Sequence, residues 1–130
     1  MPDQPLTGPV RAVRVMLVDD RADFRRAFAG LLERQPDIEV VSTAGSLAEA
    51  RRKLRGVDVA LLDRGLPDGD GVELVGELRA ANPGVRVFVI SSTAEMIHPT
   101  DAIEAGADGV IDKVETPERI FAAIREPGGA

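Results

Sequence analysis

The chain has 130 residues, a formal net charge of −6 and no cysteine. Its length suits one domain with a substantial core, and the lack of cysteine excludes disulfides, a thiolate zinc site and a cysteine nucleophile. The acidic balance and the presence of only four aromatic residues argue against direct nucleic-acid binding, which needs a basic face or a stacking platform. Because no signal pattern opens the chain and no apolar run approaches the ~20 residues of a membrane span, we expect a cytoplasmic protein that does not enter a membrane.

Short apolar runs alternate with segments of helical spacing between residues 12 and 126, and this alternation is typical of a doubly wound α/β domain. Residues 1–11 are rich in proline, glycine and polar side chains and are predicted to form a flexible tail. Residues 127–130 are predicted to be a C-terminal tail or a truncated linker. The sequence therefore predicts one domain at residues 12–126, flanked by two short segments.

The first two helices are predicted from apolar spacing and from capping. In the first, apolar residues fall at helical positions i, i+3, i+4, i+7 and i+8, namely Phe24, Ala27, Phe28, Leu31 and Leu32. Ser46 and Glu49 form a capping-box pattern that opens the second helix, which we expect to extend to Leu54. The basic run Arg51-Arg52-Lys53 with Arg55 would then form the solvated face of this helix.

Three further helices are expected after the second. The third opens at a cap formed by Asp70 with Glu73, and the last opens at the cap and first-turn pair Thr116-Pro117. Because proline cannot occupy a helix interior, Pro99 predicts a short fourth helix over about residues 100–106.

Four apolar runs end on residues that suit phosphate chemistry. The runs are 15–18, 59–62, 87–90 and 109–112, and the residues that follow them are Asp19-Asp20, Asp63, Ser91-Ser92 and Lys113. If these runs and residues 38–43 are strands of one parallel sheet, the side chains share its carboxyl edge, where open α/β sheets bind ligands. Three carboxylates, a hydroxyl and an ammonium at one edge indicate a divalent metal beside a phosphorylatable carboxylate.

Each of these residues also has an ordinary structural interpretation. Taken alone, Asp19 and Asp20 could equally be loop acids or helix caps, but Asp63 at the end of another strand favours a shared site. Three crowded carboxylates repel one another and need a cation or a proton, and Mg²⁺ prefers oxygen ligands of this kind. Taken alone, Lys113 suits a solvated loop and Ser91 suits a turn or a cap.

The order and spacing of these residues carry a resemblance to a known family. From Arg14 to Arg125, nearly the whole chain resembles a response-regulator receiver domain of two-component signalling. The matching residues are Asp19-Asp20, Asp63, Leu66-Pro67, Asp70-Gly71, Ser91, Ala105-Gly106-Ala107-Asp108-Gly109 and Lys113. The resemblance implies a flavodoxin-like α/β fold with a five-stranded parallel sheet in the strand order 2-1-3-4-5.

The resemblance also implies a phosphorylation site and its metal. Asp63 would accept a phosphoryl group from a sensor histidine kinase or a phosphotransfer protein. Mg²⁺ would be bound by Asp20, Asp63 and the backbone carbonyl of Gly65, with Asp19 acting through a water molecule. Such a domain is a signalling switch rather than an enzyme, apart from Mg²⁺-dependent autophosphorylation and autodephosphorylation.

The surroundings of the phosphoryl group depart from the family pattern. By the resemblance, Ser91 would donate a hydrogen bond to that group and Lys113 would pair with it. The aromatic residue that is usual three positions before the lysine is Val110 here, and the proline that commonly follows the lysine is Val114. We therefore expect a change on phosphorylation to pass through the loop from Ser91 to Pro99 and the short fourth helix.

The partners implied by the resemblance lie outside this domain. The stretch Lys113–Pro117 resembles receivers that are joined to a LuxR-type helix-turn-helix domain. A downstream output domain or protein, and a second copy of the chain on phosphorylation, are therefore expected partners besides the kinase. The domain itself is not expected to bind nucleic acid.

Two other function classes share some of these residues. A Mg²⁺ phosphatase of the haloacid-dehalogenase type needs a second acid two residues after its nucleophile, and Gly65 occupies that position. A phosphorylation-independent pseudo-receiver would be favoured by the loss of Asp20, Asp63 or Lys113, and all three are present. The pseudo-receiver remains the alternative.

Overall fold

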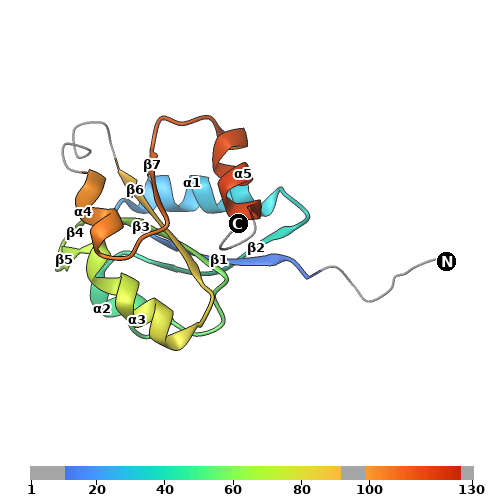
Figure 1. Cartoon of the computed structure of the whole chain (residues 1–130). Coiled ribbons are helices and arrows are strands. Elements are labelled where there is room, and N and C mark those ends of the chain that lie inside the picture. Colours follow the sequence, from blue (N-terminus) through green and yellow to red (C-terminus); the bar gives the residue numbers. More distant parts are fainter. Residues whose placement is uncertain (1–10, 92–98, 127–130) are drawn as a thin grey trace.

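A five-stranded parallel sheet forms the centre of the protein (Figure 1). The computed structural model describes residues 11–91 and 99–126, so the predicted tails and the loop between Ser91 and Pro99 lie largely outside the described residues. The strands are β1 (Val13–Val18), β2 (Ile38–Ala44), β3 (Val59–Asp63), β6 (Arg86–Ser91) and β7 (Gly109–Asp112). Their order in the sheet is β2-β1-β3-β6-β7, which confirms the predicted order 2-1-3-4-5.

Helices cover both faces of the sheet, as the near-continuous apolar strands require. Helices α1 (Ala22–Glu33) and α5 (Pro117–Arg125) lie on one face, and α2 (Leu47–Ala50) and α3 (Leu74–Ala81) lie on the other (Figure 1). Alternate strand residues therefore serve different cores: Val15 and Leu17 pack with α1 and α5, whereas Met16 packs with α2 and α3. In the described part of the chain, no helix is long and apolar enough to cross a bilayer.

Most helix boundaries follow the predicted caps. A capping box at Asp70 and Glu73 opens a single 3₁₀ turn, Gly71–Glu73, which leads directly into α3. Pro117 occupies the first turn of α5, and Ile120, Phe121 and Ile124 of that helix are buried. In α1 the inward face is narrower than predicted, because Ala27 is exposed.

The second helix is shorter than predicted. It ends at Ala50, because the next backbone N–H groups, those of Arg52 and Lys53, bond to carbonyls only three residues back and tighten the chain into turns. The Asn82 amide donates to the Leu54 carbonyl at 2.6 Å and accepts from the Val57 N–H at 3.1 Å, which holds the chain after the helix. The basic run therefore lies on a turn and not on a helix face.

The fourth helix has the predicted brevity. Helix α4 spans Pro99–Glu104, and the chain then turns at Gly106, whose φ of +105° is a conformation that favours glycine. Ala102 and Ala107 are buried against Val89 of β6, and Val110 of β7 packs on the same cluster.

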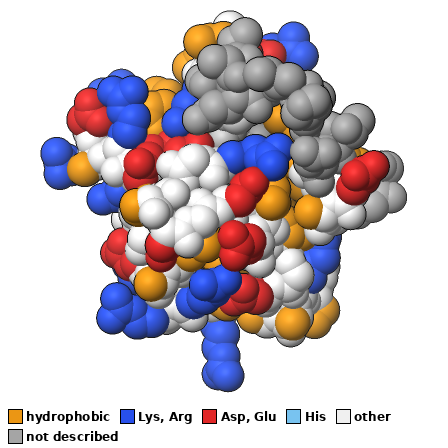
Figure 2. All heavy atoms as spheres, turned by 90° about the vertical axis from the view of Figure 1, so that its left-hand side faces the viewer, with side chains coloured by type: hydrophobic (Ala, Val, Ile, Leu, Met, Phe, Trp, Pro, Cys, Tyr) orange, Lys and Arg blue, Asp and Glu red, His pale blue; other side chains and the backbone are white. Residues whose placement is uncertain are grey.

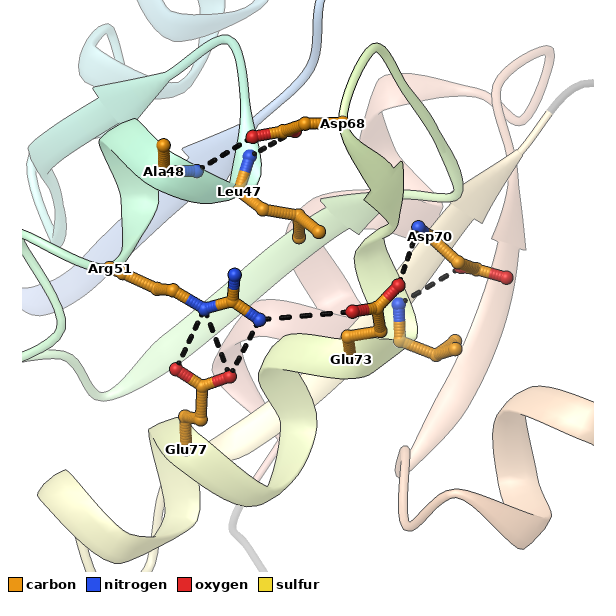
Figure 3. A network of polar contacts seen from close by, with 8 residues as sticks. Leu47, Ala48, Arg51, Asp68, Asp70, Glu73 and Glu77 are labelled. Atoms are coloured by element: carbon orange, nitrogen blue, oxygen red, sulfur yellow. Dashed lines mark hydrogen bonds and ion pairs between the residues drawn. The ribbon is translucent and has the colours of Figure 1, made fainter.

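A small hairpin after β3 connects the carboxyl edge of the sheet to α2 (Figure 3). It consists of β4 (Gly65–Leu66) and β5 (Gly69–Asp70), which pair antiparallel. At its tip, the Asp68 carboxylate accepts the N–H groups of Leu47 (2.8 Å) and Ala48 (3.0 Å), the first residues of α2. These bonds to the ionised form lower the pKa of Asp68 below its ordinary value of 3.8.

Asp68→Asn should therefore destabilise the protein at neutral pH. A carboxyl with a lowered folded-state pKa contributes stability above its unfolded value of 3.8 and loses it as the pH falls through the lower folded value. The gap between parent and variant in urea unfolding should be present at pH 7 and shrink as the pH falls below 3.8. Glu104→Gln is the control, because it removes an exposed acid that makes no hydrogen bond or ion pair with a described residue. A gap for Asp68→Asn that does not change with pH would contradict the capping role.

Candidate functional site

The carboxyl ends of the strands bring the predicted site residues to one edge of the sheet. Asp19 and Asp20 follow β1, Asp63 ends β3, Ser91 ends β6 and Lys113 follows β7. The three carboxyl groups can each place an oxygen within 4.8 Å of the others. Figure 2 faces this edge, where acidic side chains gather and basic side chains are interspersed among them.

Lys113 links two buried carboxylates across the sheet. Its Nζ lies 2.9 Å from Asp19 Oδ2, an ion pair without hydrogen-bond alignment, and 3.5 Å from Asp63 Oδ2. Asp19 is fully buried and Asp63 is 3% exposed, so water cannot solvate either charge well. The ammonium also lies 4.9 Å from the centre of the Phe24 ring in α1, a cation–π distance.

The two acids after β1 have different surroundings. Asp19 Oδ1 accepts the N–H of Arg21 at 2.8 Å, and the Asp19 carbonyl accepts Arg25 Nη1 at 2.5 Å. Asp19 is therefore fixed from both its side chain and its backbone. Asp20 is exposed, so its carboxylate is free to meet a ligand from solvent.

Asp63 is positioned by the turn that follows it. Its Oδ1 accepts the N–H of Gly65 at 3.3 Å. Gly71 packs directly beneath it: a Cβ built on Gly71 would lie 2.1 Å from the Asp63 backbone oxygen and 3.4 Å from Leu62 Cβ. Only glycine allows this close approach of two backbones. Gly71 therefore sets how closely the following turn packs against the backbone of Asp63.

Ser91 carries an unsatisfied hydroxyl. The residue is 1% exposed, and its Oγ has no hydrogen-bond partner among the described residues. Its backbone carbonyl accepts the N–H of Lys113 at 2.9 Å, so the serine and the lysine are held on adjacent strands. A buried hydroxyl without a partner is costly, which marks this position as one where a ligand oxygen would be favourable.

Sequence reasoning missed two contacts at this edge. Arg64, directly after Asp63, forms a forked ion pair with Asp70, at 2.8 Å from Nη2 and 3.2 Å from Nε to Oδ2. The helical spacing predicts Phe24 only as a core position of the first helix, whereas in the structure its ring also contacts Lys113. The turn-rich spacing between Arg64 and Asp70 was the only available signal for the ion pair, and nothing in the pattern indicated the lysine contact of Phe24.

The two departures from the family pattern lie on the β7 side. Val110 is partly buried against Ala102 and Ala107, so no aromatic side chain can swing in and out there. Val114 is 78% exposed directly after Lys113. This face of the molecule is therefore built differently from the pattern described for the family.

Comparison with known proteins identifies the family. The family model of the response regulator receiver domain matches residues 15–125. The chain belongs to the response regulator receiver domains. The transcriptional activator DevR/DosR of Mycobacterium tuberculosis is 38% identical over 118 residues, which is 89% of this chain and 54% of that protein. The chain spans about half the length of the first curated relatives it matches.

Solved receiver structures have the same fold. The receiver domain of NarL from M. tuberculosis superposes with a TM-score of 0.76 at 31% identity, covering 88% of this chain and 94% of that one. A response regulator from Burkholderia pseudomallei, solved with a phosphorylated aspartic acid and a calcium ion, gives a TM-score of 0.74 at 26% identity, covering 86% of this chain and 66% of that one. The resemblance read from the sequence is thus confirmed for the family and the fold.

Gly71→Ala should destabilise the receiver by about 1–3 kcal/mol, because the new methyl group overlaps the Asp63 backbone. The control is Gly76→Ala in α3, where a Cβ meets open space and the variant should gain about 0.5–1 kcal/mol of helix stability. Urea unfolding of both variants measures the two effects. Equal stability of the two variants would show that the backbone at Gly71 can move away from Asp63 without loss of stability.

Proposed function

We propose that this receiver is a phosphorylation-controlled switch in which Asp63 accepts a phosphoryl group from a sensor histidine kinase or a phosphotransfer protein. The observation that carries the proposal is the position of Lys113 Nζ between the buried carboxylates of Asp19 and Asp63. An acid held at an accessible sheet edge, with an ammonium beside it and an unsatisfied hydroxyl on the next strand, suits a carboxylate nucleophile.

The donor set at this edge fits Mg²⁺. Three carboxylates share the edge with one ammonium, which leaves a local charge of −2 that a divalent cation would neutralise. In the proposal Asp20, Asp63 and the Gly65 carbonyl bind the ion directly, and Asp19 acts through water. Oxygen ligands with retained waters are the shell that Mg²⁺ prefers, and the bound ion would neutralise charge on the transferring group.

The residues of the chain divide the chemistry between them. An oxygen of Asp63 attacks the phosphorus, and the bond from phosphorus to the donor nitrogen breaks as the new P–O bond forms. Lys113 offers its charge to a phosphoryl oxygen, and Ser91 donates the hydroxyl proton that finds no partner in this structure. Asp19 keeps Lys113 at the edge by its ion pair.

We further propose that the phosphoryl group acts on the face formed by α4, β7 and α5, and that a downstream output domain, a separate protein or a second copy of the chain reads this face. DevR/DosR is described as DNA-binding, and the chain covers only part of its length. We propose that here, too, any contact with nucleic acid is made by another domain and not by this acidic one. The proposed site of action is the cytoplasm.

Incubation with phosphoramidate and Mg²⁺ should add one phosphoryl group to the chain, as measured by intact mass. Asp63→Asn should abolish the addition, because an amide is not a nucleophile for phosphorus. Asp23→Asn, which changes an exposed acid of α1, should leave it intact. Equal labelling of Asp63→Asn would refute the assignment, and a chain that no donor labels would support the pseudo-receiver alternative.

Asp20→Ala should weaken Mg²⁺ binding at least about tenfold, since a direct carboxylate ligand is lost and water cannot replace its charge. The metal-free variant should be as stable as the parent or more so, because one of three crowded carboxylates is gone. Calorimetric titration with Mg²⁺ and a thermal melt measure these two effects, with Asp23→Ala as the charge-matched control. An unchanged Mg²⁺ affinity would remove Asp20 from the site.

A further inference from the structure

The basic run after α2 lines an open hollow far from the phosphorylation edge. The hollow has a volume of about 290 Å³ and is lined by Arg14, Val41, Ser42, Lys53 and Arg55. Arg14 lies near the start of β1, whereas Asp19 follows the end of that strand. The hollow therefore opens toward the opposite end of the sheet from Asp63.

Positive charge in this hollow exceeds the acids around it. Arg14 Nε donates to the Gly56 carbonyl at 2.7 Å, which leaves both terminal nitrogens of the guanidinium available. Arg55 makes no hydrogen bond or ion pair with any described residue. Lys53 is bonded to Glu49 at 3.1 Å and to the Thr43 carbonyl at 2.8 Å, and no carboxylate lines the hollow itself.

The arrangement in this hollow differs from that of several other arginines of the molecule. These arginines pair with a carboxylate, and examples are the pairs Arg51–Glu77, Arg64–Asp70, Arg79–Asp108 and Arg125–Asp37. The chain as a whole carries a net charge of −6. An anion would therefore be repelled by most of the surface and attracted to this hollow.

Ser42 supplies a second, independent observation. Its Oγ is enclosed and has no hydrogen-bond partner among the described residues. The register between β1 and β2 slips at this point, because Val15 pairs with Val40 but Met16 pairs with Ser42. Such irregularities re-aim side chains, and here the slip leaves a donor without an acceptor in the wall of a basic hollow.

Gly56 gives the hollow its shape. Its φ is +76°, a conformation that favours glycine, and a Cβ there would lie 3.0 Å from Arg14 Nη2. The glycine thus makes the turn that presents Arg55 and leaves room for the Arg14 guanidinium. The Gly56 carbonyl holds the Arg14 guanidinium, and Arg55 lines the same hollow.

We propose that this hollow binds the phosphate group of a soluble small molecule, with Arg14 and Arg55 as guanidinium donors and the Ser42 hydroxyl as a further donor. Guanidinium groups match phosphate oxygens in forked geometry. A second hollow of about 390 Å³ shares Lys53 and Arg55 and provides space for the rest of the ligand. The two hollows together suit a nucleotide-sized molecule with one or two phosphates.

Inorganic pyrophosphate is the probe, titrated into the whole chain in the presence of EDTA and followed by amide NMR. Saturable shifts are expected at Arg14, Ser42 and residues 53–56, while Asp19, Asp63 and Lys113 stay unchanged. The double variant R14Q/R55Q should lose at least about tenfold in affinity. The control R26Q/R34Q removes the same charge from exposed positions of α1 and its end, and it should bind like the parent.

Ser42→Ala separates the hydroxyl from general charge. It should weaken pyrophosphate binding without lowering the melting temperature, since it removes an unsatisfied buried group. If R14Q/R55Q fails to fold, the single variant R55Q takes its place in the titration. It should fold, because the Arg55 side chain is exposed.

Three results would overturn the proposal. Shifts confined to the Lys113 edge would assign the binding to the phosphorylation site. Equal losses in R14Q/R55Q and R26Q/R34Q would show diffuse attraction without a site. Binding to vesicles that contain phosphatidylglycerol, without binding to pyrophosphate, would assign the hollow to a lipid headgroup and not to a soluble ligand.

Discussion

The ion pairs of Lys113 are the constraint on which the site depends. The lysine comes from β7 at one side of the sheet, Asp63 from β3 near the centre and Asp19 from the end of β1. The ammonium offsets the negative charge of two carboxylates that have almost no contact with water. Removing one partner from such a buried arrangement costs about 3–5 kcal/mol, so the lysine couples the chemistry of the edge to the stability of the sheet.

A chain of polar contacts connects the segment between β3 and α3 to its neighbours, and Figure 3 shows its part from Asp70 to Glu77. Arg64 binds Asp70, and the Asp70 carboxylate accepts the N–H of Val72, while its own N–H donates to Glu73. Glu73 in turn lies 3.8 Å from Arg51, which also binds Glu77 in α3. These exposed pairs contribute little energy singly, but together they leave the hairpin few alternative positions.

The fold and the residues at the carboxyl edge of the sheet could be predicted from the sequence, because both depend on local patterns. Apolar runs followed by polar residues predict strands and their carboxyl ends, and parallel pairing then brings Asp63 near Asp19 without further information. The capping box at Asp70 could be predicted in the same way, since it is a four-residue pattern.

Features that depend on distant contacts could not be predicted in the same way. The early end of α2 is coupled to Asn82, whose amide holds Leu54 and Val57 from a separate helix end. The basic hollow needs Arg14 from β1 beside Arg55, residues that are 41 positions apart in the chain. The ion pair of Arg64 with Asp70 depends on the β4–β5 hairpin. No alternation of apolar and polar residues predicts this hairpin.

The β7 side of the molecule limits how a change at Lys113 can spread. Val110 packs against Ala102 and Ala107, and a valine side chain has a single rotatable bond and no polar group. It can neither swing out to solvent nor exchange a hydrogen bond. The backbone offers a more direct route, because the Lys113 N–H is bonded to the Ser91 carbonyl and the exposed Val114 follows immediately. In the proposed switch, a phosphoryl group that draws the ammonium away from Asp63 would act first on the strand end and on the turn before α5. The helices that cover the sheet would respond only through these two segments.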